Sequence, residues 1–283
     1  MKTIHAPKAL IYDSDCTLCA AYSRAFVKLG VLGPHERIAF AELDRQEFIA
    51  RLDAQRQGNE IPLVDLGGGT TLYGIDALLC LLERRWPLPV RVCRVQPFYG
   101  FFRRLYALIS YNRRIILAKN YCSSKYNCAP AFNRTYRITF LFVAAIIAGL
   151  ITYAFGESLA ACGNEMSFIN GARMLVICSA GWALTLLAAL LFMKGEKLSY
   201  AGHLATLQLI GTFVLLPAVM IAPLIGKAGM AVCAVSVLAS SLLMLRGHYR
   251  RVQLLGLSQR WTIVWLFLLQ SSAVIATLFF YHR

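Results

Sequence analysis

The chain has 283 residues, of which 58% are hydrophobic and 15% are charged, and its formal net charge is +15. Soluble domains usually contain about 25% charged residues, so the composition argues against a wholly soluble protein. Residues 1–137 hold 20 Lys or Arg and 11 Asp or Glu, whereas residues 138–283 hold only 9 and 3, which predicts a basic first unit and a very apolar second one.

The positive charge does not predict nucleic-acid binding. Much of the excess lies in short segments beside apolar runs, where Lys and Arg set the topology of membrane proteins. A nucleic-acid-binding domain would instead gather its basic residues on one compact face. We therefore expect a lipid bilayer, and no nucleic acid, among the partners.

The N-terminus does not have the pattern of a secretory signal. Its first apolar run covers only residues 9–12, which is too short for the apolar part of a signal peptide. We expect the first unit to stay on the cytoplasmic side, where it is made. The nine cysteines are an odd number, which argues against a disulfide framework.

The first unit reads as alternating short strands and helices. Gly30 is a plausible end for its first helix, and Gly67, Gly68 and Gly69 mark a turn. The order is β-α-β-α-β-β-α, which predicts a thioredoxin-like α/β domain over residues 1–95. The expected strands are 9–12, 37–43, 61–65 and 70–73, and the expected helices are 20–29, 44–57 and 74–86.

A Cys-x-x-Cys pair, Cys16 and Cys19, follows the first strand and opens the first helix. Backbone N–H groups and the dipole at a helix start stabilise a thiolate. We expect Cys16 to be the attacking nucleophile and Cys19, one turn later, to resolve the mixed disulfide. Asp13 and Asp15 would raise the pKa of Cys16, unless one of them is protonated and shuttles a proton.

This segment resembles the DCC family of predicted thiol-disulfide oxidoreductases, named for an Asp-Cys-x-x-Cys signature. The signature here is Tyr12-Asp13-Ser14-Asp15-Cys16-Thr17-Leu18-Cys19, with Ser14 where the family has glycine. The resemblance continues through Ile61-Pro62, residues 73–78 and residues 106–114. It implies a thioredoxin-like fold, dithiol chemistry with protein or small-molecule thiols, and a cis-proline at Pro62 facing Cys16.

Two other kinds of chemistry could use the same residues. Cys16 and Cys19 could be half of a zinc site, with Cys122 and Cys128 as the other half, in a membrane scaffold or transport accessory protein. Asp13-Ser14-Asp15-Cys16-Thr17 also matches the Asp-x-Asp-x-Thr motif of haloacid-dehalogenase-like phosphatases, with Mg²⁺ between the acids. The lysine and late acidic pair of such phosphatases are not evident downstream, so neither a metal nor another cofactor is our first expectation.

Residues 96–136 form a basic and aromatic extension that leads to the membrane unit. Its helical part, residues 97–119, could lie in the membrane interface or cover the sheet, and the two roles can occupy opposite faces. Cys122 and Cys128 follow in a polar loop. They could be a second dithiol that exchanges with Cys16 and Cys19, or loop cysteines without a role.

Residues 137–283 contain apolar runs long enough to cross a bilayer, which takes about 20 residues per helix. Basic residues flank alternate ends of these runs, and Glu157–Asn170 has none, so the positive-inside rule puts the first unit in the cytoplasm and Arg283 outside. The third run contains Pro217 and Pro223 and should kink or end early. The expected spans are 138–156, 173–193, 199–225, 228–245 and 261–281.

Three further cysteines lie in this membrane unit. We expect Cys162 in the outer loop, and Cys178 and Cys233 inside spans, where a buried cysteine usually behaves as a small apolar residue. The sequence alone gives no sign that any of these cysteines face one another. His203, near the start of the third span, is expected to be interfacial or hydrogen-bonded rather than a ligand.

The sequence thus predicts a thioredoxin-like α/β domain joined to an all-α transmembrane bundle of about five spans. The expected activity is thiol-disulfide exchange at the cytoplasmic face of a membrane of the bacterial inner-membrane type. The expected site residues are Cys16, Cys19, Asp13, Asp15 and Pro62. A reducing glutathione pool favours reduction of the substrate over its oxidation.

Overall fold

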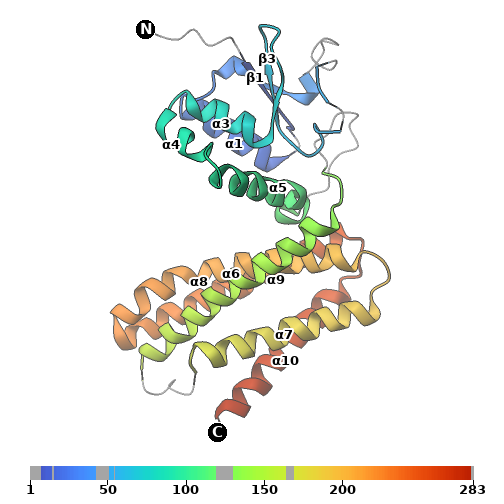
Figure 1. Ribbon diagram of the computed structural model, residues 1–283. Coiled ribbons are helices and arrows are strands. Elements are labelled where there is room, and N and C mark those ends of the chain that lie inside the picture. Colours follow the sequence, from blue (N-terminus) through green and yellow to red (C-terminus); the bar gives the residue numbers. More distant parts are fainter. Residues whose placement is uncertain are drawn as a thin grey trace. The chain divides into compact units, whose positions relative to one another are not determined.

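The computed structural model describes residues 8–14, 16–42, 51–53, 55–118, 130–163 and 169–281. The chain divides into two compact units, Met1–Arg137 and Ile138–Arg283. The first is a mixed α/β unit and the second is built of long helices, as expected from the division of charge (Figure 1).

The α/β unit contains a four-stranded sheet in the order β2-β1-β3-β4. β1 is parallel to β2 and antiparallel to β3, and β4 is antiparallel to β3. These pairings confirm the predicted thioredoxin-like arrangement. The strands are β1 (Lys8–Tyr12), β2 (Arg37–Ala39), β3 (Pro62–Asp65) and β4 (Leu72–Tyr73).

Side chains of β1 alternate between the two faces of the sheet, and both faces are buried. Leu10 packs on one face in the cluster that contains Ala77 and Leu81 of α3. Ala9 and Ile11 pack on the other face. Burial on both faces explains why β1 reads as a continuous apolar run. The helices of this unit are α1 (Thr17–Lys28), α3 (Gly74–Glu83), α4 (Pro87–Cys93) and α5 (Phe98–Leu117).

The first helix ends where the sequence predicts. Leu29 caps α1, and Gly30 then adopts a φ of 67°, a left-handed conformation that glycine reaches without strain. Other boundaries differ from the prediction. The second strand stops at Ala39, because residues 40–42 form a 3₁₀ turn. The helix expected to reach Gln57 is wrong at its end, where residues 55–59 form turns, and its first part, 44–50, lies outside the described residues.

The second unit contains five helices that are long and apolar enough to cross a membrane. Pro217 lies inside α8, which gives way to a 3₁₀ turn at residues 222–224, so the predicted early end of this span is confirmed. The helices are α6 (Arg134–Ala161), α7 (Gly171–Phe192), α8 (Lys197–Ile221), α9 (Gly229–Leu254) and α10 (Arg260–Tyr281).

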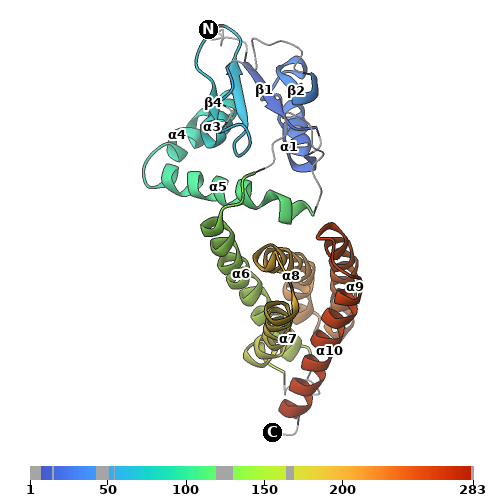
Figure 2. The same cartoon turned by 90° about the vertical axis from the view of Figure 1, so that its right-hand side faces the viewer.

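Small residues let these helices approach closely. α8 runs beside α9, and α7 beside α10 (Figure 2). A Cβ at Gly181 of α7 would meet Leu269 of α10 at 2.7 Å. On the other pair, Ser240 Oγ of α9 donates a 2.9 Å hydrogen bond to the Gly211 carbonyl of α8. Packing through glycine and serine is typical of helices that associate in lipid.

Candidate active site

Cys16 lies at the junction of the first strand and the first helix. It caps α1 with extended backbone angles, and its Sγ accepts the Cys19 N–H at 3.4 Å. Its own N–H donates to the Asp13 carbonyl at 3.2 Å, and its carbonyl accepts the Ala20 N–H at 2.9 Å. The sulfur therefore faces an N–H group at the positive end of a helix, the setting that favours a thiolate.

Both cysteines of the pair are buried thiols. Cys16 is 0% and Cys19 is 2% exposed, and they share a cluster with Tyr12, Ala39 and Leu117. Burial disfavours a charged thiolate, whereas the helix start favours it. The site therefore combines a helix N-terminus, which can stabilise a thiolate, with an apolar environment that excludes water.

The two acidic residues of the motif differ in what the structure shows. Asp13 is 4% exposed and lies at the end of β1, three residues before Cys16. Asp15 lies outside the described residues. Asp13 is therefore the buried acidic residue that the structure describes in the motif, and the roles predicted for Asp13 and Asp15 stay predictions.

Pro62 is buried at the start of β3, as predicted, but its peptide bond is not cis. Among the described residues, the cis peptide bond is the one between Gln96 and Pro97, so the cis geometry expected at Pro62 is wrong. The neighbour of Pro62, Ile61, is the residue that lines the same pocket as Cys19. The Ile61 N–H donates to the Tyr106 hydroxyl, and the Ile61 carbonyl accepts the Gly74 N–H.

An apolar pocket of about 260 Å³ opens beside Cys19. Side chains of α1 form one wall, and α5 forms the other with three groups that carry polar atoms, Tyr106, Ser110 and Arg113. Ligand pockets are typically apolar with a few placed polar groups. The remaining lining residues are Leu18, Tyr22, Phe26, Ile61, Leu78 and Ile109.

The same three α5 residues hold the loop that leads into β3. Ile61 N–H donates to the Tyr106 hydroxyl at 2.9 Å, and Arg113 Nη2 donates to the Gly58 carbonyl at 2.6 Å. Ser110 Oγ donates to the Asn59 carbonyl. Because Tyr106, Ser110 and Arg113 follow one another at spacings of four and three residues, they share one face of α5.

Burial raises the pKa of Tyr106 to about 12. The Ile61 N–H and the nearby Arg113 act in the opposite direction, and Glu60 and Cys19 add to the increase. The phenol is therefore neutral at physiological pH. A neutral hydroxyl can accept the Ile61 N–H while its ring forms part of the pocket wall beside Cys19.

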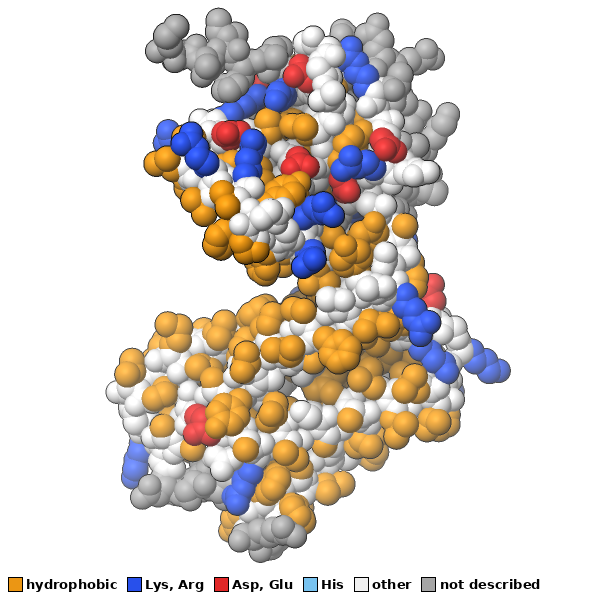
Figure 3. Space-filling view, viewed as in Figure 1, with side chains coloured by type: hydrophobic (Ala, Val, Ile, Leu, Met, Phe, Trp, Pro, Cys, Tyr) orange, Lys and Arg blue, Asp and Glu red, His pale blue; other side chains and the backbone are white. Residues whose placement is uncertain are grey.

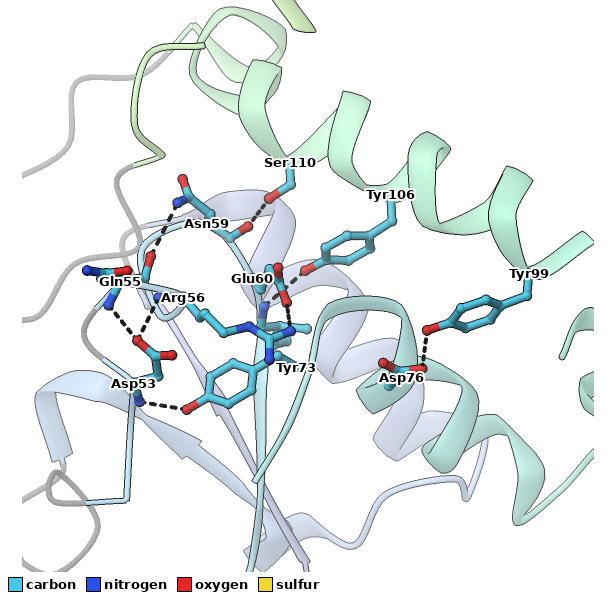
Figure 4. A network of polar contacts seen from close by, with 11 residues as sticks. Asp53, Gln55, Arg56, Asn59, Glu60, Tyr73, Asp76, Tyr99, Tyr106 and Ser110 are labelled. Atoms are coloured by element: carbon cyan, nitrogen blue, oxygen red, sulfur yellow. Dashed lines mark hydrogen bonds and ion pairs between the residues drawn. The ribbon is translucent and has the colours of Figure 1, made fainter. Parts of the chain in front are cut away.

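A second, polar pocket of about 390 Å³ lies between α5 and the β3–β4 region. Figure 4 shows its network, in which Arg56 pairs with Glu60 at 2.7 Å and Tyr99 donates to Asp76 at 2.9 Å. Tyr106 and Ser110 line both pockets. The α5 face is thus shared by an apolar cavity that reaches Cys19 and a charged one that does not.

The α5 contacts were only partly predictable. A helix covering the sheet was one expectation for residues 97–119, and its contacts with residues 58–61 support that expectation. The particular residues were not predicted, since the recurrence of Tyr106, Ser110 and Arg113 on one face is a weak signal among many aromatic and basic residues. A neighbouring face of α5 carries an exposed apolar stripe of Phe98, Phe101, Leu105 and Ile109, and Ile109 also lines the pocket beside Cys19.

The described residues contain no group of three or more His, Cys, Asp or Glu placed to hold a metal ion. Cys122 and Cys128, the partners considered for zinc and for a second dithiol, lie outside the described residues, as does Asp15. Their predicted roles therefore stay open.

Comparison with known proteins supports dithiol chemistry. Residues 10–119 match the family model described as DCC1-like thiol-disulfide oxidoreductase. No curated protein and no solved structure matches the chain. The matched range contains most of β1, the Cys16–Cys19 pair, all residues that line the pocket beside Cys19 and all of α5. The chain therefore carries a DCC1-like thiol-disulfide oxidoreductase domain, and five long apolar helices follow it.

Proposed function

We propose that this protein is a membrane-anchored thiol-disulfide oxidoreductase that reacts through Cys16 and Cys19. The observation that carries the proposal is the position of Cys16 at the start of α1, with its Sγ 3.4 Å from the Cys19 N–H. This places the two sulfurs one helical turn apart, and the family of the domain supplies the reaction type.

In the proposed reaction the Cys16 thiolate attacks one sulfur of a substrate disulfide. That S–S bond breaks, one substrate thiol leaves, and Cys16 is held in a mixed disulfide. Cys19 then attacks the Cys16 sulfur, which releases the second substrate thiol and leaves a Cys16–Cys19 disulfide. Two electrons have passed from the protein to the substrate, and two thiols of the glutathione class then restore the dithiol and leave as one disulfide.

Asp13 is the proposed proton acceptor for the thiols. It is buried, lies three residues before Cys16 and accepts the Cys16 N–H with its backbone carbonyl, so it is the described acidic residue nearest in sequence to the pair. Asp15 is proposed to share this role.

The pocket beside Cys19 is the proposed site for an apolar part of the substrate. Its walls are mainly aliphatic and aromatic, and its polar atoms come from the α5 face that also fixes Ile61. A disulfide substrate with an apolar group next to the sulfur would fill the pocket and bring its S–S bond to the pair. Pro62, buried beside Ile61, completes the proposed substrate-facing edge without a cis bond.

The five long helices are the proposed membrane anchor. Basic residues flank alternate helix ends, and by the positive-inside rule the α/β unit faces the cytoplasm and Arg283 lies outside. The apolar stripe of α5, together with Arg104 on the same helix, is suited to the membrane interface. Exposure to the reducing cytosolic thiol pool favours substrate reduction as the direction.

Trapping of a mixed disulfide tests the proposal. The full chain in detergent is mixed with 5,5′-dithiobis(2-nitrobenzoic acid), and adducts are assigned by peptide mass spectrometry. In Cys19→Ser the reagent should remain bound to Cys16, because the resolving thiol is missing. Cys93→Ser, the matched control in α4, should form the Cys16–Cys19 disulfide as the wild type does.

Two results would count against the proposed roles. If Cys16→Ser traps the reagent at Cys19 while Cys19→Ser traps nothing, then Cys19, which lines the pocket, is the attacking residue. If neither variant forms an adduct at the pair while Cys93 reacts, the pair does not exchange disulfides and the proposed function fails.

A further inference from the structure

A second pair of cysteines meets inside the helical unit. Cys162 is the first residue after α6 and is 1% exposed, and Cys233 lies in the second turn of α9 and is 2% exposed. Both belong to one buried cluster with Phe155, and their thiol groups interact. Both are present as thiols.

A glycine makes this approach possible. Gly229 is the first residue of α9, and a Cβ at this position would lie 2.8 Å from Cys162 Sγ. Gly229 and Cys233 are four residues apart, so they lie on the same face of α9. The face of α9 that is turned toward Cys162 therefore carries both the glycine that admits the sulfur and the second thiol.

Hydrogen bonds hold Cys162 at this place. Its Sγ donates to the Ser158 carbonyl at 3.1 Å, and Ser158 Oγ donates to the Val219 carbonyl of α8 at 3.2 Å. The end of α6 is thereby connected to α8 and packed against α9. Among the cysteines in the described ranges, Cys178 of α7 lies in no such cluster with another cysteine.

The pair lies at the end of the bundle where α6 ends and α9 begins, at the left of the helical unit in Figure 1. α6 has 28 residues and is therefore about 40 Å long, so this end is far from Ile138, where the bundle begins. If α6 crosses a membrane, the pair is near the face opposite to the one where α6 starts. In the proposed topology that face is outside, where disulfides persist.

We propose that Cys162 and Cys233 are a second redox-active dithiol, which forms a reversible disulfide between α6 and α9. The oxidant is a small disulfide. One cysteine thiolate attacks it, its S–S bond breaks and one small thiol leaves, and the other cysteine then displaces the second small thiol from the mixed disulfide. Two protein thiols and one small disulfide give one protein disulfide and two small thiols. The proposal is independent of the reaction at Cys16 and Cys19.

The test uses the full chain in detergent with 4,4′-dithiodipyridine as the small disulfide. After reaction the protein is denatured in N-ethylmaleimide, digested and examined by mass spectrometry, which distinguishes free thiols, reagent adducts and cross-linked peptides. The expected product is a cross-link between the Cys162 and Cys233 peptides. Cys178→Ser should leave its yield unchanged, and Cys162→Ser should abolish it and leave Cys233 as a reagent adduct.

Reduction of the oxidised protein with dithiothreitol should return both cysteines to the maleimide-labelled form. The proposal is overturned if both cysteines remain thiols under conditions that oxidise Cys16 and Cys19. It is equally overturned if each carries its own adduct without a cross-link, or if either joins another cysteine instead. Because each cysteine is read from its own peptide, failure here is distinct from failure of the proposed function.

Discussion

The α/β unit and the helical unit differ in the side chains that they expose. In the α/β unit the apolar residues of β1 and β3 are inside. In the helical unit large apolar side chains cover the outside, while Thr185, His248 and Ser272 are buried. Figure 3 shows hydrophobic side chains over the visible face of the helical unit, and charged ones concentrated on the α/β unit. The surface of the first unit is therefore suited to water, and the surface of the second is suited to lipid.

The same comparison applies to the cysteines. Cys16 and Cys19 are close because they lie one turn apart at the start of a single helix. Cys162 and Cys233 are close only because α6 and α9 pack together. The proximity of the first pair depends on local structure, and that of the second pair depends on tertiary structure. Substitutions that disturb helix packing should therefore separate Cys162 from Cys233 more readily than Cys16 from Cys19.

The largest expected effect comes from a charge on the lipid-facing surface. Leu238 lies in the middle of α9 and is 60% exposed, and Leu88 of α4 is 70% exposed. Leu238→Lys should destabilise the inserted protein by about 2.5–3.5 kcal/mol, the usual cost of lysine at the centre of a membrane helix. Leu88→Lys should change stability by about 0.5 kcal/mol or less.

Unfolding of both variants in lipid vesicles measures this difference. Equal effects of the two substitutions would mean that the exposed apolar residues of α9 do not face lipid.

Removing the buried histidine should have the next largest effect. Tyr200 OH and His248 Nε2 are 2.9 Å apart, His248 Nδ1 is 3.2 Å from Thr262 Oγ1, and the ring stacks on Trp265 at 4.4 Å. His248→Ala leaves two buried hydroxyl groups without this partner, and we expect a loss of about 2–3 kcal/mol.

His35→Ala serves as the control, because His35 is exposed in the α/β unit. Its expected effect is below about 0.5 kcal/mol. Thermal unfolding of the detergent-solubilised proteins compares the two, and an unchanged Tm for His248→Ala would show that the buried network contributes nothing.

Loss of a single hydroxyl tests the α5 contact with β3. In Tyr106→Phe the Ile61 N–H loses its acceptor, and we expect about 1–2 kcal/mol of lost stability and slower exchange at the dithiol. Tyr99, also in α5, donates its hydroxyl to Asp76 of α3 at an exposed position, so Tyr99→Phe should reduce stability by only about 0.5 kcal/mol. If the two variants are equally stable and equally active, Tyr106 does not position the Ile61–Pro62 segment.

The smallest expected effect concerns Glu36. Burial alone would raise its pKa, but the Gly33 N–H and Arg84, whose Nη1 is 2.7 Å away, lower it on balance. The stabilisation is therefore present above the unfolded pKa of 4.5 and is lost as the pH falls through the lowered folded value. Glu36→Gln should cost about 0.5–1 kcal/mol at pH 7 and less at pH 3. Denaturant unfolding at both pH values would show a constant difference if the ion pair were irrelevant.

Much of the architecture was predictable because its signals are local. A short continuous apolar run identifies β1, long apolar runs identify the five spans, and Gly30 marks the end of α1 through its left-handed backbone. The Cys-x-x-Cys motif was found for the same reason, since both residues belong to one turn. The trans bond before Pro62 was missed because the family likeness suggested a cis bond there.

What the sequence did not reveal depends on contacts between distant segments. The hydrogen bond from the Ile61 N–H to the Tyr106 hydroxyl joins residues 45 positions apart, and no periodic pattern in the sequence specifies it. The meeting of Cys162 and Cys233 depends on how α6 packs on α9. β2 is shorter than its apolar run because the chain turns at Phe40, whose side chain is buried against Ile11 and Val64.

The most direct test of the central claim is an equilibrium redox titration of the full chain in detergent, with Cys16 and Cys19 read separately by alkylation and mass spectrometry. The account predicts one reversible two-electron transition shared by both cysteines, with a potential below about −200 mV and absent from Cys16→Ser and Cys19→Ser. The account is contradicted if the two never pair, or if they stay protected until a bound metal is chelated.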